Sequence, residues 1–163
     1  KIRFDAKYGD SLYLQLIYDG KTTLNYLSDK AKPYQKYFSW SNNFGFSIIR
    51  FADRDSFQVQ RLTDDQVEGY PVFIVQITDP QKMVTTFSID QKTFLIRGVA
   101  FKTDIGYHHR IYSDFEKLKP VGGKGFFMQP KRLRIYFDGI KWMDIRWEKN
   151  VVNEKIEDQI FVK

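Results

Sequence analysis

Apolar and polar residues alternate along most of the 163-residue chain. Near the start, every second residue of 2–6 and of 12–16 is apolar, and similar alternation recurs many times further on. Because successive side chains of a β-strand point to opposite faces of a sheet, a period of two is typical of strands with one buried face. The pattern therefore predicts a mainly β protein.

Turn signals divide this pattern into segments of about ten residues. Asp19-Gly20 and Asp138-Gly139 favour tight two-residue hairpins, because glycine tolerates positive φ. Between the turns, the pattern predicts strands over residues 2–6, 12–16, 22–26, 34–40, 57–62, 70–78, 84–90, 94–103, 107–115, 126–129, 132–137 and 141–150. Strands at this regular spacing predict a meander, sandwich or barrel, and one domain spanning residues 1–163.

The period changes once, in residues 44–54. Ser41-Asn42-Asn43 can cap a helix, and apolar residues then follow at helical spacing: Phe44, Ile48 and Phe51. A short helix is predicted here, with a strand over 46–51 as the alternative, since Phe and Ile favour strands. The segment is apolar on most sides, whereas a helix on a sheet normally needs one apolar stripe. It is either a helix packed on a curved sheet or a lid over an apolar groove.

Composition adds three limits. A chain of this length buries about 70% of the surface that its unfolded form exposes, so it needs no disulfides, and it contains no cysteine. Aromatic residues make up 17%, which suits strands and apolar pockets. The formal charge is +6, but Lys and Arg are scattered and only residues 131–134 form a compact basic group. A scattered excess of this kind favours solubility over a binding stripe.

Two observations concern localisation. The sequence has no run of 18 apolar residues, so we predict no membrane-spanning helix. The chain begins at Lys1 in a strand-like pattern, with neither Met nor a signal peptide. We expect a processed or truncated chain from which the targeting segment has been removed.

Candidate metal and phosphate sites are weak. His108 and His109 are adjacent on a predicted strand, so they point to opposite faces and cannot share one metal without a bulge. The glycine-rich residues 122–125 lack the Gly-Lys-Ser/Thr ending, and a strand pattern follows them instead of a helix. They predict a hairpin loop. No metal and no cofactor are expected.

Candidate catalytic and nucleic-acid-binding groups are equally weak. The carboxylate pairs 64–65 and 157–158 lie in polar turn-like segments, and the serines lack a nucleophile elbow. The basic residues 131–134 beside Tyr136 and Phe137 suggest either nucleic acid or a strand with one solvated basic face, and we favour the strand. The sequence thus predicts no catalytic residues, no enzyme and no nucleic-acid partner.

The order of short segments along the chain carries a further signal. These segments are Leu16–Lys21 with Tyr26, Gly69-Tyr70-Pro71 through Asp79-Pro80, Ile89–Thr93, Tyr112–Phe115, Pro130, and finally Asn153, Ile156, Glu157 and Phe161. In this order and spacing they resemble the LolA/LolB-like outer-membrane lipoprotein carrier superfamily over nearly the whole chain. The helix and first strands with which that family begins have no counterpart here, so they are expected to be truncated or supplied by a partner.

The resemblance implies a single large curved antiparallel sheet, a half-barrel, with a short helix as a lid on its concave side. It implies a non-enzymatic carrier of the bacterial cell envelope or periplasm that binds lipid or lipoprotein acyl chains. An anionic membrane surface or an envelope protein would be a further partner. The alternative is an envelope protein-interaction or stress-sensing regulatory module that uses the same sheet. An enzyme on this sheet is a third class, which would need convergent polar groups.

The resemblance also implies a ligand site made of apolar side chains. The strand residues expected to line its cavity are Leu12, Leu14, Leu16, Phe73, Val75, Ile77, Leu133, Ile135 and Phe137. The residues expected in the lid are Phe44, Phe46, Ile48, Ile49 and Phe51. A register slip of one residue would reverse the face on which each strand residue lies.

Overall fold

The computed structural model describes residues 2–18, 23–30, 32, 46–49, 52–103 and 106–150. Within these ranges the protein is mainly β, with eleven strands and one short α-helix. The chain divides into two compact units, one holding β1–β3 and the other holding the helix α2 and β4–β11. Each unit is described by itself, and the expectation of one domain over residues 1–163 stays a prediction.

The first unit contains a three-stranded antiparallel sheet in the order β1-β2-β3. Its strands are β1 (Ile2–Tyr8), β2 (Ser11–Tyr18) and β3 (Thr23–Leu27), which confirms the three strands expected there. Gly9 has a φ of 59° and forms the tight turn between β1 and β2. The expected turn at Asp19-Gly20 and the expected strand at 34–40 lie outside the described residues.

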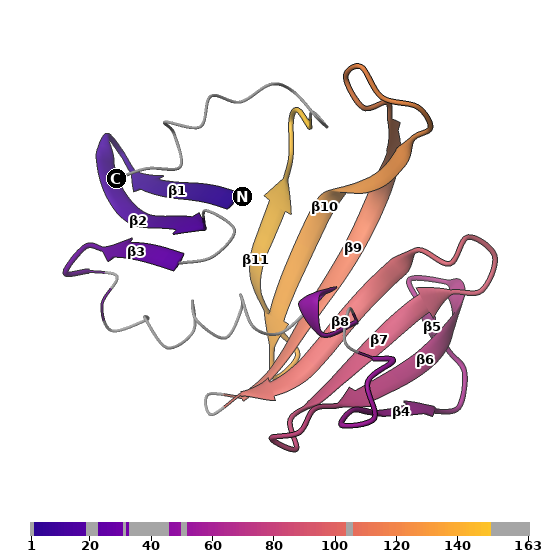
Figure 1. Cartoon of the computed structure of the whole chain (residues 1–163). Coiled ribbons are helices and arrows are strands. Elements are labelled where there is room, and N and C mark those ends of the chain that lie inside the picture. Colours follow the sequence, from indigo (N-terminus) through magenta and orange to yellow (C-terminus); the bar gives the residue numbers. More distant parts are fainter. Residues whose placement is uncertain are drawn as a thin grey trace. The chain divides into compact units, whose positions relative to one another are not determined.

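The second unit is built on one large antiparallel sheet of eight strands (Figure 1). The strands follow one another in the order β11-β10-β9-β8-β7-β6-β4, and β5 also pairs with β6. In the described residues the two end strands, β11 and β4, do not pair with each other, so the sheet is not closed into a barrel. The strands are β4 (Gln58–Arg61), β5 (Asp65–Val67), β6 (Tyr70–Thr78), β7 (Val84–Asp90), β8 (Ile96–Thr103), β9 (Gly106–Leu118), β10 (Phe127–Phe137) and β11 (Ile140–Arg146).

Several strand predictions were wrong in their bounds: β8 begins two residues later than expected, β9 ends three residues later, and β11 ends at Arg146 instead of residue 150. The strands expected at 126–129 and 132–137 are one strand, β10, with Pro130 inside it. Proline has no N–H to donate to the ladder. The pairing of β10 with β9 accommodates it, because Pro130 lies opposite Phe115 and the register then continues at Arg132, while Asp114 takes a φ of 55°.

The helix prediction was wrong at its C-terminal end. The helix α2 covers Phe46–Ile49, whereas Ala52 to Arg54, which we expected to be helical, form turns. The N–H of Ala52 donates to the carbonyl of Ile49 at 3.2 Å, which closes a tight turn. Asp53 then adds a negative charge beside the C-terminus of the helix, where the dipole disfavours it.

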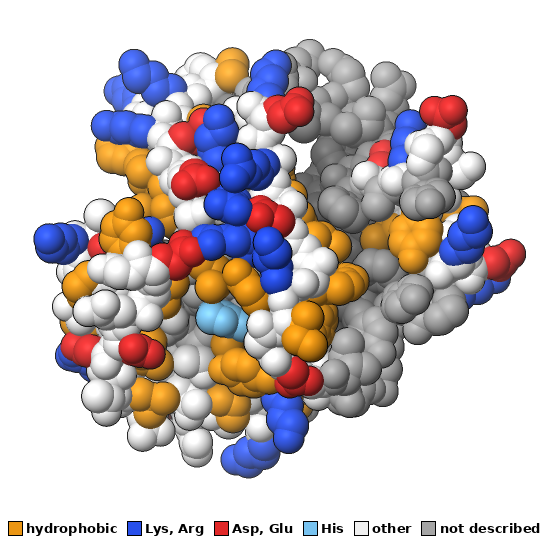
Figure 2. Space-filling view, turned by 180° about the vertical axis from the view of Figure 1, so that it is seen from behind, with side chains coloured by type: hydrophobic (Ala, Val, Ile, Leu, Met, Phe, Trp, Pro, Cys, Tyr) orange, Lys and Arg blue, Asp and Glu red, His pale blue; other side chains and the backbone are white. Residues whose placement is uncertain are grey.

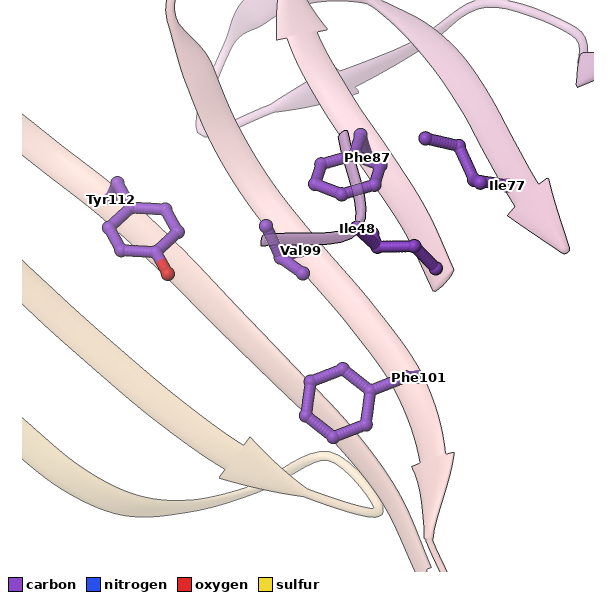
Figure 3. Close-up of a cluster of buried hydrophobic side chains, with 6 residues drawn as sticks. All are labelled: Ile48, Ile77, Phe87, Val99, Phe101 and Tyr112. Atoms are coloured by element: carbon purple, nitrogen blue, oxygen red, sulfur yellow. The ribbon is translucent and has the colours of Figure 1, made fainter. Parts of the chain in front are cut away.

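The main hydrophobic cluster of the second unit lies on one side of the large sheet (Figure 3). Its buried side chains come from α2 and from β6 to β9: Ile48, Ile77, Phe87, Val99, Phe101 and Tyr112. Phe87 and Val99 are fully buried. At about 25 cal/mol per Å² of buried apolar area, such side chains contribute strongly to the stability of this unit. We call this side the apolar face and the other side the polar face.

Candidate functional site

Strand register decides which predicted site residues share a face. One row of paired residues runs across β6 to β11 on the apolar face: Val75, Phe87, Val99, Arg110, Ile135 and Met143. Side chains two residues apart on one strand lie on the same side. The expected cavity residues of this unit therefore all lie on the apolar face: Phe73, Val75 and Ile77 on β6, and Leu133, Ile135 and Phe137 on β10.

The helix packs on the same apolar face. Ile48 is buried in the core cluster beside Ile77, Phe87 and Val99 (Figure 3). Ile49, by contrast, is exposed. Phe46 lies in α2, and its side chain is outside the description, as are Phe44 and Phe51 altogether. Among the expected residues, those brought together are thus Ile48 and the six side chains of β6 and β10.

The remaining expected residues belong to the first unit. On β2, Leu14 is buried and Leu12 is half-buried, and the side chain of Leu16 is outside the description. The two units are described separately, so a cavity shared by Leu12, Leu14 and the apolar face stays a prediction.

An aromatic row follows one edge of the apolar face. His108 stacks on Phe101 with ring centroids 4.6 Å apart and meets Phe137 edge-on at 4.8 Å. Phe137 in turn contacts Trp142 at 5.4 Å. Burial is the main reason why the pKa of His108 falls to about 4, and the nearby Arg110 lowers it further. His108 is therefore a neutral aromatic member of the core at pH 7.

Arg110 is the residue of this face that the sequence did not single out. It lies between Val99 and Ile135 in the central row, is half-buried, and donates from Nε to Nε2 of His108 at 2.9 Å. In residues 107–112, both the odd-numbered and the even-numbered positions contain a mixture of aromatic, basic and apolar side chains. The sequence alone therefore did not indicate which of the two sets lies on the apolar face. The pairing of Val99 with Arg110 settles it.

The polar face carries paired charges (Figure 2). Arg97 contacts Asp90 at 2.5 Å and Arg132 contacts Asp144 at 2.6 Å. Arg134 pairs with Glu68. The expectation that Arg132 and Arg134 lie on the face opposite Leu133 is confirmed by the register, but both guanidiniums are matched by carboxylates instead of facing solvent as free cations.

Asp90 is the most buried of these carboxylates. Burial acts to raise its pKa, but Arg97 and the backbone N–H groups of Thr93 and Lys92 outweigh it, so the pKa lies well below its usual value. The guanidinium of Arg97 also sits 3.4 Å from the centroid of the Tyr70 ring. Through its contacts with Asp90 and Tyr70, Arg97 links the start of β8 to the end of β7 and the start of β6.

Two hollows open on the polar face. The larger, of about 750 Å³, includes Thr86, Ser88, Ala100, Tyr107 and His109 in its lining, and residues 60–67 form its other wall. The smaller, of about 300 Å³, is lined by Tyr107, His109, Ile111, Tyr136 and Gly139. Both lie opposite the face on which a lipid cavity was expected.

The part of the chain that the structure describes contains neither a group of metal-ligating side chains nor a membrane-spanning helix. No three His, Cys, Asp or Glu side chains there gather into a group that could hold a metal ion. Among those residues, no helix has the length and apolar character needed to cross a membrane. His109 lies on the polar face and His108 on the apolar face, as the sequence predicted for adjacent strand residues.

Comparison with known proteins adds no relative to this picture. No protein-family model, no curated protein and no solved structure matches the chain. The residues of the apolar face must therefore support any functional proposal by their own chemistry.

Proposed function

We propose that this protein is a non-enzymatic carrier of the bacterial cell envelope that binds acyl chains of lipid or lipoprotein on the apolar face of its large sheet. The proposal extends the resemblance to LolA-like half-barrels, in which α2 would act as the lid. The observation that carries it is the one-sided distribution of apolar side chains over an open sheet that is covered, in the described residues, by a four-residue helix.

The apolar face also reaches solvent at one end, which supports the proposal. On β11, Met143 is 37% exposed at the end of the central row, and Trp142 is 60% exposed beside Phe137. Burying each CH₂ group of an acyl chain contributes about 0.8 kcal/mol. A chain lying along this row would be held by contact area alone and could pass to an acceptor with a larger apolar site.

A matched pair of variants tests this proposal. Met143 on the apolar face and Val84 on the polar face are equally exposed, at 37% and 38%. We expect the wild-type protein to raise the fluorescence of an apolar probe, and a fatty acid to displace it. Met143→Glu should weaken probe binding about tenfold or more, because a carboxylate without a partner is costly beside an acyl chain. Val84→Glu should bind normally.

Two outcomes would count against the proposal: no probe binding by the wild-type protein, or equal losses in both variants. Equal losses in both variants, or normal probe binding by both, would favour the alternative of an envelope interaction module. A specific feature favours that alternative, because β11 is an end strand that exposes Ile140 and Trp142 among the described residues. Aromatic side chains and Met are enriched at protein interfaces.

A further inference from the structure

Arg110 is a cation placed in an apolar row. Its neighbours across the ladder are Val99, which is fully buried, and Ile135, which is buried. Its guanidinium carbon lies 5.8 Å from the centroid of the Phe101 ring. A half-buried guanidinium in such surroundings loses part of its hydration, so it needs an anion or several acceptors nearby.

The described partners of Arg110 are neutral. His108 accepts the hydrogen bond from Nε, and its pKa of about 4 leaves the imidazole uncharged at pH 7. Tyr112, two residues further along the same face, is buried, and burial raises the pKa of its phenol, so it too is neutral. Neither group compensates the charge of the guanidinium.

The arginines of the polar face provide the contrast. Arg97, Arg132 and Arg134 each form an ion pair with a carboxylate of this chain. In the described residues, Arg110 has no carboxylate within 4.0 Å. On the apolar face, Arg61 of β4 is likewise paired, with Asp64 at 3.0 Å. Among the described residues, Arg110 thus differs from these four arginines in having no carboxylate partner, although its surroundings are apolar.

The geometry of the guanidinium limits which anion could pair with Arg110. Nε donates to His108 and the guanidinium also hydrogen-bonds Tyr112, which leaves further N–H groups on Nη1 and Nη2. A guanidinium can use such groups to bind a planar carboxylate through two parallel hydrogen bonds. The row continues from Arg110 through Ile135 to the partly exposed Met143, which offers an apolar path toward solvent. An anionic head joined to one apolar chain fits both features.

We propose that Arg110 binds the carboxylate of a fatty acid whose chain lies along the apolar face past Ile135 toward Met143. This inference rests on the proposed function, because it names the ligand of the same face. His108 and Tyr112 hold the guanidinium in place as positioning residues.

The experiment compares decanoate with decan-1-ol at pH 8, each below the concentration at which it aggregates, by displacement of an apolar fluorescent probe. The two ligands share a chain and differ in the charge of the head group. We expect the wild-type protein to bind decanoate at least tenfold more tightly. In Arg110→Met this preference should disappear while decan-1-ol still binds. Arg146→Met, which removes an exposed arginine of β11, should behave like the wild type.

Each other result is decisive. If the wild-type protein binds decanoate and decan-1-ol equally, the anchoring role of Arg110 is wrong and acyl binding stands. If it binds neither, the proposed function fails as well. If decyl phosphate binds far more tightly than decanoate, the head group is a phosphate and the carboxylate assignment is overturned. Arg110→Lys keeps the charge but loses the planar pair of donors, so it should retain part of the preference, which provides a second variant if Arg110→Met does not fold.

Discussion

An arginine on each face of the large sheet has a different kind of hydrogen-bond partner. On the polar face, Arg97 is held by Asp90 and stacks over Tyr70. On the apolar face, Arg110 is held by the neutral His108 among core side chains. Both arginines lie on strands of one sheet, and the strand register sets the face of Arg110. Within the described residues, Arg97 is thus neutralised by a carboxylate of this chain, whereas Arg110 has no carboxylate within 4.0 Å.

The faces also differ in what makes them stable. The apolar face relies on contact area, with Phe87 and Val99 fully buried against α2 and neighbouring strands. The polar face relies on directed ion pairs and hydrogen bonds, such as those that converge on Asp90. Substitutions chosen one from each face can test this division.

The largest effect is expected from Phe87→Ala on β7. This change removes a fully buried ring from the centre of the apolar face and leaves a cavity, so we expect a loss of about 3–5 kcal/mol in the free energy of unfolding. The measurement is urea denaturation followed by circular dichroism. Thr86→Ala, one residue away and on the polar face, is the control and should cost less than about 1 kcal/mol. Similar losses for both would refute the assignment of the core to one face.

A smaller effect is expected from Asp90→Asn. The amide oxygen can still accept from backbone N–H groups, but the charged hydrogen bond to Arg97 is lost, so we expect a loss of about 1.5–3 kcal/mol. Asp144→Asn breaks the more exposed pair with Arg132 on the same face and should cost clearly less. The same urea titration measures both, and an equal cost would show that burial does not distinguish these pairs.

The sequence predicted the strands of the large sheet best where alternation and turn residues agree. β6 and β7 begin and end at the residues expected, because Glu68-Gly69 and Asp79-Pro80 mark the turns that precede them. Glu68 and Gly69 both have positive φ, as a tight hairpin requires. Alternation also placed Phe73, Val75 and Ile77 together, since the period of two needs no tertiary information.

The rest depended on pairing between distant segments. The short strand β5 was expected to be a turn, because Asp65 is a poor strand former and only the partner strand β6 stabilises it there. β8 begins at Ile96 and not at Phe94, because Asp90 accepts from the N–H groups of Lys92 and Thr93 and so extends the turn. Arg110 could not be identified for the same reason, since its face is set by the register with β8 and β10.

The smallest expected effect compares the two adjacent histidines, one on each face, through the pH dependence of stability. Burial lowers the pKa of both, to about 4 for the stacked His108 and by a smaller amount for His109. A folded-state pKa below the ordinary value of about 6.5 means that the unfolded chain binds the proton more readily. Stability should thus be fully present above pH 6.5, decline as the pH falls, and level off near pH 4.

The decisive measurement is the midpoint of urea unfolding between pH 7 and pH 5, a window in which Asp90 stays largely ionised in both the folded and the unfolded chain. His108→Phe keeps an aromatic ring between Phe101 and Phe137 and removes the titrating group, so it should abolish most of the decline. His109→Gln should abolish less. Because water still reaches part of each ring, the decline should be smaller than the roughly 1.4 kcal/mol per pKa unit of a fully enclosed group. If His109→Gln removed more of the pH-dependent decline than His108→Phe, the polar face and not the apolar face would be the one that more strongly disfavours a protonated histidine.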